Sequence, residues 1–261
     1  AMRILRVCYV PLAAAVLIWP VAAAAVEIRI VYDNNAADPA MRADWGFASV
    51  VDFRESRILF DAGADGPLLL RNLAVAGIDP ASITHTVISH RHADHRNGLF
   101  TLALKNRTMK VYFLDTFPAE LYELAAAVAL SPVRVKGPVE ITPGAYSTGM
   151  VEGDPEEQAL VLETSGGLVI LTGCSHPGVV RLVEMAREQR GVQVVRLLLG
   201  GFHMYRQGEE AIREQIVRLQ ELGVEQVAPA HCTGERARQL FSRAFGAGCL
   251  AAGAGRRIVL E

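Results

Sequence analysis

Apolar and polar residues follow two different periodic patterns along this chain, and together these patterns predict a mixture of strands and helices. Stretches of alternating or unbroken apolar residues, bounded by glycine, proline and polar turns, are typical of β-strands. They occur at residues 26–32, 47–53, 57–61, 84–89, 111–114, 159–163, 168–172, 192–199 and 224–229. The turn Ser165-Gly166-Gly167 joins two of these runs into a predicted hairpin.

Apolar residues at helical spacing form the second pattern, which lies in the segments between the strands. Predicted helices span residues 67–76, 118–130, 177–189, 209–222 and 234–245. The first ends at Gly77 and the fourth at Gly223, and glycine is the residue type that most often ends a helix. Strands followed by helices occur twice in succession, which predicts two β-sheets packed together with helices outside them. We therefore expect one domain of two similar halves over residues 26–261.

The N-terminal 25 residues differ from the rest of the chain. A basic head with Arg3 and Arg6 precedes an uncharged apolar stretch, residues 7–25, that ends in alanines. This layout is typical of a secretory signal peptide. We expect residues 1–25 to be cleaved and the mature protein to be exported, either to the periplasm or out of the cell, so that it meets the membrane only transiently. The alternative is an uncleaved membrane anchor formed by residues 7–25.

Composition narrows the class of protein and of partner. Hydrophobic residues make up 51% of the chain and charged residues 21%, which favours a globular chain with a buried core. The formal net charge of -2 gives no electrostatic reason to bind nucleic acid. The expected partner is a small-molecule substrate, and the oligomeric state stays open. Once Cys8 leaves with the signal peptide, an odd number of cysteines remains, so the chain has no disulfide framework.

The candidate chemistry lies in histidines that follow the predicted strands. His85 opens a strand and is expected to be structural. The other histidines, together with one aspartate, follow the ends of four strands: His90, His92, Asp94 and His95, then His176, His203 and His231. We expect these four strands to deliver all seven side chains to the same rim of the molecule.

The spacing of these residues explains how such a rim holds cations. Residues two apart in an extended segment point the same way, so His90 and His92 can grip one cation. Asp94 and His95, where we expect the loop to turn, can reach a second cation nearby. Imidazole and carboxylate groups suit Zn²⁺, with Mn or Fe as alternatives. We therefore expect two divalent metal ions, which lower the pKa of water and polarise the group to be cleaved.

The order His90-x-His92-x-Asp94-His95, followed by a distant histidine after each of two later strands, resembles the metallo-β-lactamase superfamily. The resemblance implies an α+β fold, the αββα four-layer sandwich of two mixed β-sheets flanked by helices, with a two-metal site at its edge. It also implies two ligand sets: His90, His92 and His176 for one metal, and Asp94, His95 and His231 for the other. Asp61 matches an early strand-end aspartate of the family that supports the ligands from behind.

Further motifs resemble one branch of that superfamily. They are Asp33-Asn34-Asn35, Trp45-Gly46-Phe47, Gly173-Cys174-Ser175-His176-Pro177-Gly178, Gly200-Gly201-Phe202-His203 and His231-Cys232-Thr233-Gly234. The branch is named for a dihydropteroate-synthase-like activity of the methanopterin type, which condenses a dihydropterin with a ribosyl-aminobenzene phosphate.

The chain departs from the superfamily at the aspartate that usually bridges the two metals, because no aspartate follows Asp154. His203 stands in its place, and it either replaces the bridge as a metal ligand or binds substrate. Cys174 and Cys232 lie beside candidate ligands. Either could be a soft ligand, but burial at a strand end is the expected role, and Cys174 is assigned to the layer that supports the ligands.

The predicted function is that of a metal-dependent hydrolase. A metal-bound hydroxide would attack an ester, phosphoester, lactone, thioester or amide, with Asp94 and His203 as the catalytic residues. One alternative is the dihydropterin-condensing activity of the branch, against which the export signal counts. The other is a metal-binding or sensing protein without turnover, which the missing bridging aspartate motivates.

Overall fold

The structure of this protein, a computed structural model, describes residues 25–261. Apart from Ala25, the predicted signal peptide and its alternative, a membrane anchor, lie outside the described residues. Within residues 25–261, no helix is both long and apolar enough to cross a membrane.

The first of two mixed β-sheets has seven strands in the order β13-β1-β2-β3-β4-β5-β6. The strands are β1 (Val26–Tyr32), β2 (Ala48–Phe53), β3 (Ser56–Phe60), β4 (His85–Val87), β5 (Lys110–Leu114), β6 (Val133–Val135) and β13 (Arg257–Leu260). Neighbours are antiparallel from β13 to β3 and parallel from β3 to β6. The last strand pairs with the first, Leu260 opposite Val26, so both ends of the domain meet in this sheet.

The second sheet has six strands in the order β12-β11-β10-β9-β8-β7. They are β7 (Val139–Thr142), β8 (Ala145–Ser147), β9 (Leu160–Thr164), β10 (Gly167–Thr172), β11 (Val195–Gly201) and β12 (Val227–Ala230). Neighbours are antiparallel from β7 to β10 and parallel from β10 to β12. In each sheet, therefore, the parallel strands send their C-terminal ends to one edge, the place where α/β proteins bind ligands.

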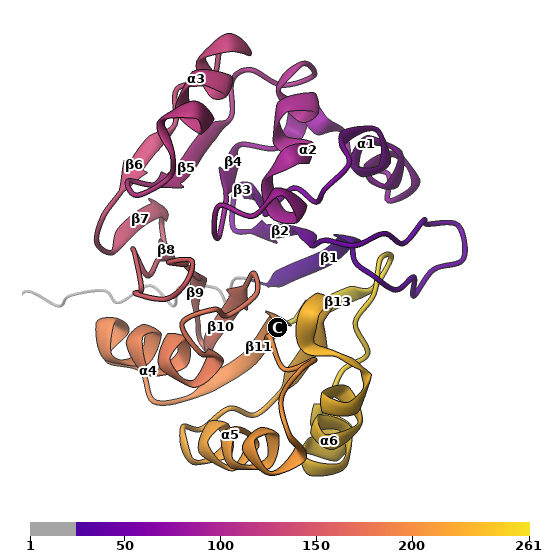
Figure 1. The fold of residues 1–261 in the computed structure, drawn as a ribbon, viewed down its shortest axis with the longest axis vertical. Helices are drawn as coiled ribbons and strands as arrows, with labels where there is room; N and C mark the ends of the chain where they lie inside the picture. The colour runs from indigo at the N-terminus through magenta and orange to yellow at the C-terminus, as the bar shows by residue number, and fades with distance from the viewer. Residues whose placement is uncertain (1–24) are drawn as a thin grey trace, which may run out of the picture.

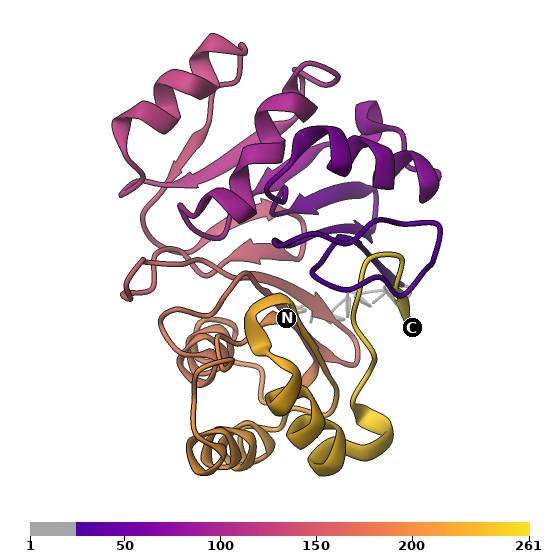
Figure 2. The same ribbon diagram turned by 45° about the vertical axis from the view of Figure 1, so that its right-hand side comes forward.

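Helices cover the outer face of each sheet, which gives four layers (Figures 1 and 2). The helices on the first sheet are α1 (Gly66–Val75), α2 (Ala93–Ala103) and α3 (Ala119–Ala127). Those on the second sheet are α4 (Val179–Arg190), α5 (Glu209–Glu221) and α6 (Glu235–Phe245). The predicted αββα sandwich of two mixed sheets flanked by helices is confirmed.

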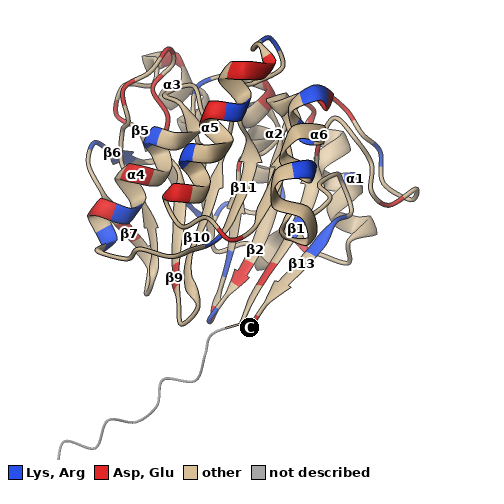
Figure 3. Ribbon diagram, turned by 90° about the horizontal axis from the view of Figure 1, so that it is seen from below, with Lys and Arg blue, Asp and Glu red and all other residues tan. Residues whose placement is uncertain are grey.

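Strand β10 shows how the sequence pattern produces these layers. Val169 and Leu171 belong to the core that this sheet shares with the first sheet. Leu168 and Ile170, which point the other way, belong to the core under α4, α5 and α6. The strand is apolar on both faces because both are covered. Charged residues of both signs instead lie along the outward helices (Figure 3).

Helix α2 is the main correction to the sequence prediction, which placed Asp94 and His95 in a turning loop. That prediction is wrong: both residues lie in the first turn of α2, with His92 as the preceding cap residue and no side-chain capping bond. The first turns of α2 are polar and contain Gly98, so the sequence carries little apolar periodicity there. Burial of the later residues against α1 stabilises the helix instead.

Four strands were also absent from the sequence prediction, namely β6, β7, β8 and β13. Each has at most four residues. Runs this short carry too few positions for an alternating pattern to stand out from the surrounding turns.

Gly98 fixes the approach of α2 to the first sheet, and this gives a testable prediction. A Cβ atom at Gly98 would lie 2.0 Å from the Ala62 carbonyl oxygen, so Gly98→Ala must push α2 away. We expect a loss of about 1–3 kcal/mol in the free energy of unfolding, together with weaker metal binding, because α2 carries Asp94 and His95. Urea unfolding and metal titration measure both. Gly137→Ala, where a Cβ meets nothing within 4 Å, is the matched control and should change neither.

Candidate metal centre

The structure brings the seven predicted side chains to one edge of the sandwich, where the chain leaves β4, β10, β11 and β12. Backbone conformation at this edge is unusual. Four residues here other than glycine have positive φ: Asp61 (58°), Ser175 (63°), His203 (49°) and His231 (44°). Such conformations are strained, and strained residues cluster at functional sites because the surrounding structure must hold them in place.

His95 is held by a buried carboxylate. Its Nδ1 atom lies 2.7 Å from Asp61 Oδ2, and both side chains are fully buried. Nδ1 must donate here because the carboxylate can only accept, which leaves Nε2 facing the cleft. Burial disfavours a charged ring, but the Asp61 carboxylate outweighs it and raises the pKa of His95 to about 9. His95 therefore attracts a positive charge to Nε2.

His231 is held in the same way from the other side. Its Nδ1 atom lies 2.9 Å from Asn34 Oδ1, which also accepts from the Gly46 amide, so Nδ1 is again the donor. The two Nε2 atoms of His231 and His95 then face each other at 3.2 Å. Two nitrogens bound to one tetrahedral cation at about 2.0–2.1 Å would be about 3.3 Å apart. The separation fits a shared cation.

Asp94 lies beside the same two nitrogens. Its Oδ2 atom is 3.4 Å from His231 Nε2 and 3.7 Å from His95 Nε2. Burial opposes ionisation, but the two histidines hold the pKa of Asp94 below its usual range, so the carboxylate is charged. The three groups place one charged carboxylate and two ring nitrogens together, the set that the resemblance implied for one of the metals.

The second set of donors contains His90, which is also oriented by Asp61, through Ser89. The Ser89 hydroxyl donates to Asp61 Oδ2 at 2.8 Å and lies 2.9 Å from His90 Nδ1. Because the hydroxyl has only one hydrogen, Nδ1 must be the donor to it, and His90 Nε2 is free to bind. His90 Nε2 lies 3.1 Å from His92 Nδ1, again close to the spacing of two ligands on one metal. One buried carboxylate therefore sets the orientation of a candidate ligand in each set.

His176 completes the second set. Its ring centroid lies 4.8 Å from that of His90 and 4.9 Å from that of His92. Among the described residues, its buried Nε2 atom has no hydrogen-bond partner. Burial and the nearby His203 lower the pKa of His176 to about 3, so the ring is neutral and can bind a cation. A buried ring nitrogen without a hydrogen-bond partner is suited to bind a cation.

Glu157 is a key residue of the centre that the sequence analysis missed. It is fully buried, and its carboxylate accepts the backbone N–H groups of Gly173, Cys174, Ser175 and His176 at 2.9–3.0 Å. Burial raises its pKa to about 7 against the effect of these bonds. No motif identified it, because it is one of two adjacent glutamates before β9 and only the fold separates them.

Replacement of Glu157 should therefore destabilise the protein strongly. In Glu157→Ala, four buried donors lose their acceptor, and we expect the free energy of unfolding to fall by about 3 kcal/mol. Urea unfolding of metal-free protein measures this. Glu156→Ala, which removes only a half-exposed ion pair with Arg91, is the control and should change stability by less than about 1 kcal/mol. An equal effect in both variants would contradict this role.

His203 lies in the wall of the cleft rather than between the two sets of donors. Its ring centroid is 4.3 Å from that of His176 and 5.4 Å from that of Tyr205. Within residues 25–261, it joins a group of potential ligands only with two thiols, those of Cys174 and Cys232. Contact with Cys232 raises the pKa of His203. This position suits a side chain that meets substrate better than one that replaces the missing bridge.

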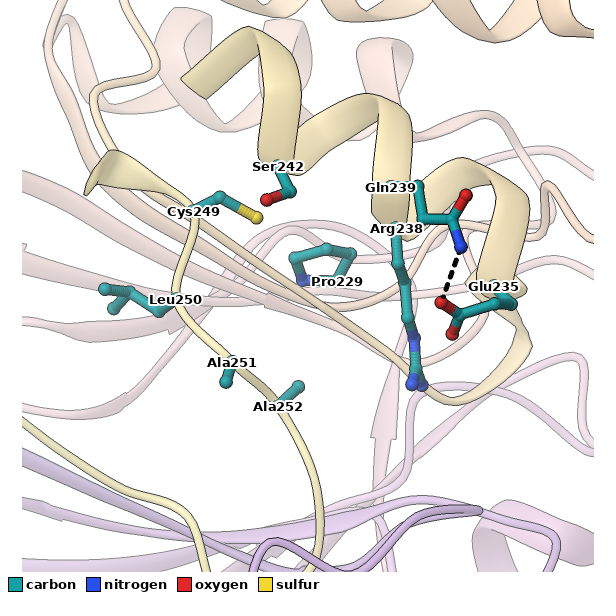
Figure 4. A pocket seen from close by; sticks show the side chains of 9 residues that line it. All are labelled: Pro229, Glu235, Arg238, Gln239, Ser242, Cys249, Leu250, Ala251 and Ala252. Carbon is teal, nitrogen blue, oxygen red and sulfur yellow. Dashed lines mark hydrogen bonds between the residues drawn. The ribbon is translucent and has the colours of Figure 1, made fainter. Parts of the chain in front are cut away.

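The branch motifs at the N-terminal end support His231 from behind. Asp33 Oδ2 accepts the His231 backbone N–H at 2.9 Å, and Arg238 lies 3.7 Å from the other oxygen of Asp33. Arg238 extends from α6 along a cavity of about 360 Å³, between α6 and residues 249–252 (Figure 4).

The motif Trp45-Gly46-Phe47 packs against the start of α2. A Cβ at Gly46 would lie 2.5 Å from the Asp94 carbonyl oxygen, so glycine lets the loop of this motif close over α2.

A cleft of about 210 Å³ opens above the donors, lined by Trp45, His92, Asp94, Cys174, His176, His203, Tyr205, His231 and Cys232. Trp45 and Tyr205 stand at its mouth, half-exposed, with ring centroids 6.4 Å apart. Trp45 also packs edge-on against His231 at 5.0 Å. The cleft therefore combines a floor of potential metal ligands with an aromatic rim.

Comparison with known proteins agrees with this geometry. A family model described as a β-lactamase superfamily domain matches residues 56–160, which contain the motif at residues 90–95. A curated relative from Methanocaldococcus jannaschii is named 7,8-dihydropterin-6-methyl-4-(β-D-ribofuranosyl)-aminobenzene-5'-phosphate synthase. It is 27% identical over 235 residues, which cover 73% of this chain and 80% of the relative.

Solved structures extend the comparison to the whole fold. A metal-dependent hydrolase of the β-lactamase superfamily has a TM-score of 0.75 and 26% identity, with 89% of this chain and 98% of that chain covered. The metallo-β-lactamase fold protein YhfI from Bacillus subtilis has a TM-score of 0.69 at 13% identity, with 91% and 100% covered, and shares the fold. The sandwich, the histidine-lined edge and these matches together show the metallo-β-lactamase fold and a similarity to proteins of the metallo-β-lactamase superfamily.

Proposed function

We propose that this protein is a metal-dependent hydrolase that holds two divalent cations at the edge of the sandwich. The ligands would be His90, His92 and His176 for one cation, and Asp94, His95 and His231 for the other. The observation that carries the proposal is the pair of Nε2 atoms of His95 and His231, 3.2 Å apart, with both Nδ1 atoms already used as donors. A cation between them satisfies both rings and the Asp94 carboxylate at once.

These residues would hold cations that, when bound, would supply a nucleophile from water at neutral pH and polarise the bond to be cleaved. We propose Zn²⁺, because a site rich in imidazole favours it, with Mn or Fe as alternatives. The chain's own residues supply the rest. Asp94 provides fixed negative charge on the first turn of α2, and the His203 imidazole in the cleft wall is placed to give a proton to the leaving group.

The rim favours a small substrate with a flat or anionic part. Trp45 and Tyr205 offer aromatic faces and edges at the mouth, and the exposed Arg206 guanidinium lies 5.1 Å from the centroid of the Tyr205 ring. By contrast, Arg91 is taken up by ion pairs with Asp154 and Glu156. Arg206 is therefore the cation we expect an anionic ester or phosphoester to meet.

Arg206→Ala tests this expectation. We expect KM for an anionic substrate to rise roughly fivefold, since an exposed ionic contact contributes about 1 kcal/mol. The kcat value should change little, because Arg206 does not touch the donors. Steady-state kinetics with a phosphodiester and a neutral ester of the same leaving group measure it, and only the first should respond. Arg213→Ala, on the exposed face of α5, is the control.

Metal removal and return test the hydrolase proposal as a whole. Protein stripped with a chelator should lose turnover of phosphodiesters, lactones, thioesters and aryl esters, and one of Zn²⁺, Mn²⁺ or Fe²⁺ should restore it. The proposal would be contradicted if the protein bound less than one equivalent of transition metal and showed no chelator-sensitive turnover of any substrate in this panel.

The second candidate function is the condensing activity, which the relative with 27% identity favours. Incubation with a dihydropterin and a ribosyl-aminobenzene phosphate, followed by mass spectrometry, tests it directly: a condensation product would favour it over hydrolysis. The location of the protein bears on the choice, because phosphorylated pterin precursors are cytosolic. We propose that the protein is exported, and fractionation of cells that express the full chain tests this.

A further inference from the structure

We propose that Cys174 is a metal ligand shared by both cations, and that its thiolate takes the place of the missing bridging aspartate. This inference rests on the two-metal centre proposed above. The sequence analysis named Cys174 as a possible soft ligand but expected it to support the ligands from behind, and the inference reverses that expectation.

The position of the thiol carries the argument. Cys174 Sγ forms one compact group with the ring nitrogens of His90 and His176, and another with those of His95 and His231, with all atoms of each group within 4.8 Å of one another. It therefore lies between the two sets of donors. Sγ is 3.3 Å from His95 Nε2. A thiolate at about 2.3 Å and an imidazole at about 2.0–2.1 Å from one tetrahedral cation would be about 3.6 Å apart.

The loop around Cys174 is built to hold the thiol in this position. Its backbone N–H is bound to the buried Glu157 carboxylate at 2.9 Å. The residue is only 4% exposed and still lines the cleft. A Cβ at Gly201 would lie 2.5 Å from the Gly173 carbonyl oxygen and 3.3 Å from Cys174 Cα, so glycine on β11 lets this loop pack closely against the strand.

Cys232 does not occupy an equivalent place. Its thiol points toward the Cys174 carbonyl oxygen at 3.6 Å, and among the described residues it joins a compact group only with Cys174 and His203. Cys249 is farther still, in the cavity beside α6 (Figure 4). Of the three free thiols in residues 25–261, Cys174 alone forms a compact group with two histidines from each set of donors.

Coordination by Cys174 has a defined proton balance. Its S–H bond would break and the proton would leave to solvent, and two electron pairs of the thiolate sulfur would form one bond to each cation. The thiolate brings the negative charge that a bridging carboxylate would have supplied. A soft donor also changes metal choice, favouring thiophilic ions over Mg²⁺ or Mn²⁺.

Cobalt substitution separates Cys174 from the other thiols. Co²⁺ is added to metal-free wild-type protein and to three metal-free variants, and the absorption spectra are recorded. The variants are Cys174→Ser, Cys232→Ser and Cys249→Ser. We expect a sulfur-to-cobalt charge-transfer band in the wild type and in the Cys232 and Cys249 variants, and its loss only in Cys174→Ser. A band that persists in Cys174→Ser or disappears in Cys232→Ser would overturn the inference.

X-ray absorption at the zinc edge of the loaded wild type needs no variant and keeps the test open if Cys174→Ser does not fold. It should show a sulfur neighbour as well as nitrogen and oxygen, and a shell of nitrogen and oxygen alone would refute the role of Cys174. Calorimetry should find one more proton released per chain in the wild type than in Cys174→Ser. Wild type that binds no metal at all would refute the proposed metal centre itself, whereas metal bound without sulfur refutes only this inference.

Discussion

Asp61→Ala is expected to lower the affinity of the protein for both metals at once. Asp61 is fully buried and orients His95 directly and His90 through the Ser89 hydroxyl, so a single carboxylate supports one ligand in each set. Removal of such a supporting partner lowers metal affinity on the order of 10–100-fold. We expect a decrease of this size in the affinity for each of the two cations. Turnover at limiting metal should then be lost almost entirely. Competition titration with a chromogenic chelator measures both affinities.

Ser89→Ala is the control that separates the two paths. It leaves the contact of Asp61 with His95 intact and removes only the link to His90. We expect it to lower the affinity for the cation bound by His90 and to leave the affinity for the other cation unchanged. If Asp61→Ala bound both metals as tightly as the wild type, the orienting role of Asp61 would be wrong.

His203→Ala is expected to keep both metals and to lose turnover. His203 lies in the cleft wall, with its ring against those of His176 and Tyr205, outside the two sets of proposed ligands. Loss of a proton-donating side chain lowers kcat by about 10²–10⁴-fold. Metal content by mass spectrometry and steady-state kinetics on the same preparations measure the two effects.

The control for His203 is His85→Ala, which alters a half-buried histidine on β4 whose ring stacks on Tyr112, away from the cleft. It should change neither metal content nor kcat. Loss of one metal in His203→Ala would instead make His203 a ligand, the alternative role that the sequence analysis left open. Retention of both metals with no loss of turnover would show that His203 is neither a ligand nor a catalytic residue.

The sequence predicted the architecture and the meeting of the histidines for the same physical reason. Parallel strands send their C-terminal ends to one edge, so polar side chains directly after buried strands must lie close together. His176, His203 and His231 each lie within four residues of the end of a strand. Apolar patterning reveals the order of such strands and turns well.

Features that depend on contacts between distant segments could not be predicted in this way. Helix α2 has a weak apolar pattern and is stabilised by its neighbours, so the sequence suggested a loop around Asp94. Glu157 resembles its neighbour Glu156 in sequence, but only Glu157 is buried under the loop that carries His176. Asn34 was part of a recognised motif, yet its bond to His231 spans 197 residues of chain and is visible only in the fold.

The proposed hydrolase activity requires two cations, held by the proposed ligands at this edge of the sandwich. Crystals of zinc-loaded protein, measured at the zinc absorption edge, test that claim most directly through anomalous scattering. We predict two anomalous peaks, one bound by His90, His92 and His176 and the other by Asp94, His95 and His231. A single peak, or peaks bound by other residues, would contradict the two-metal centre on which the proposed hydrolase activity rests.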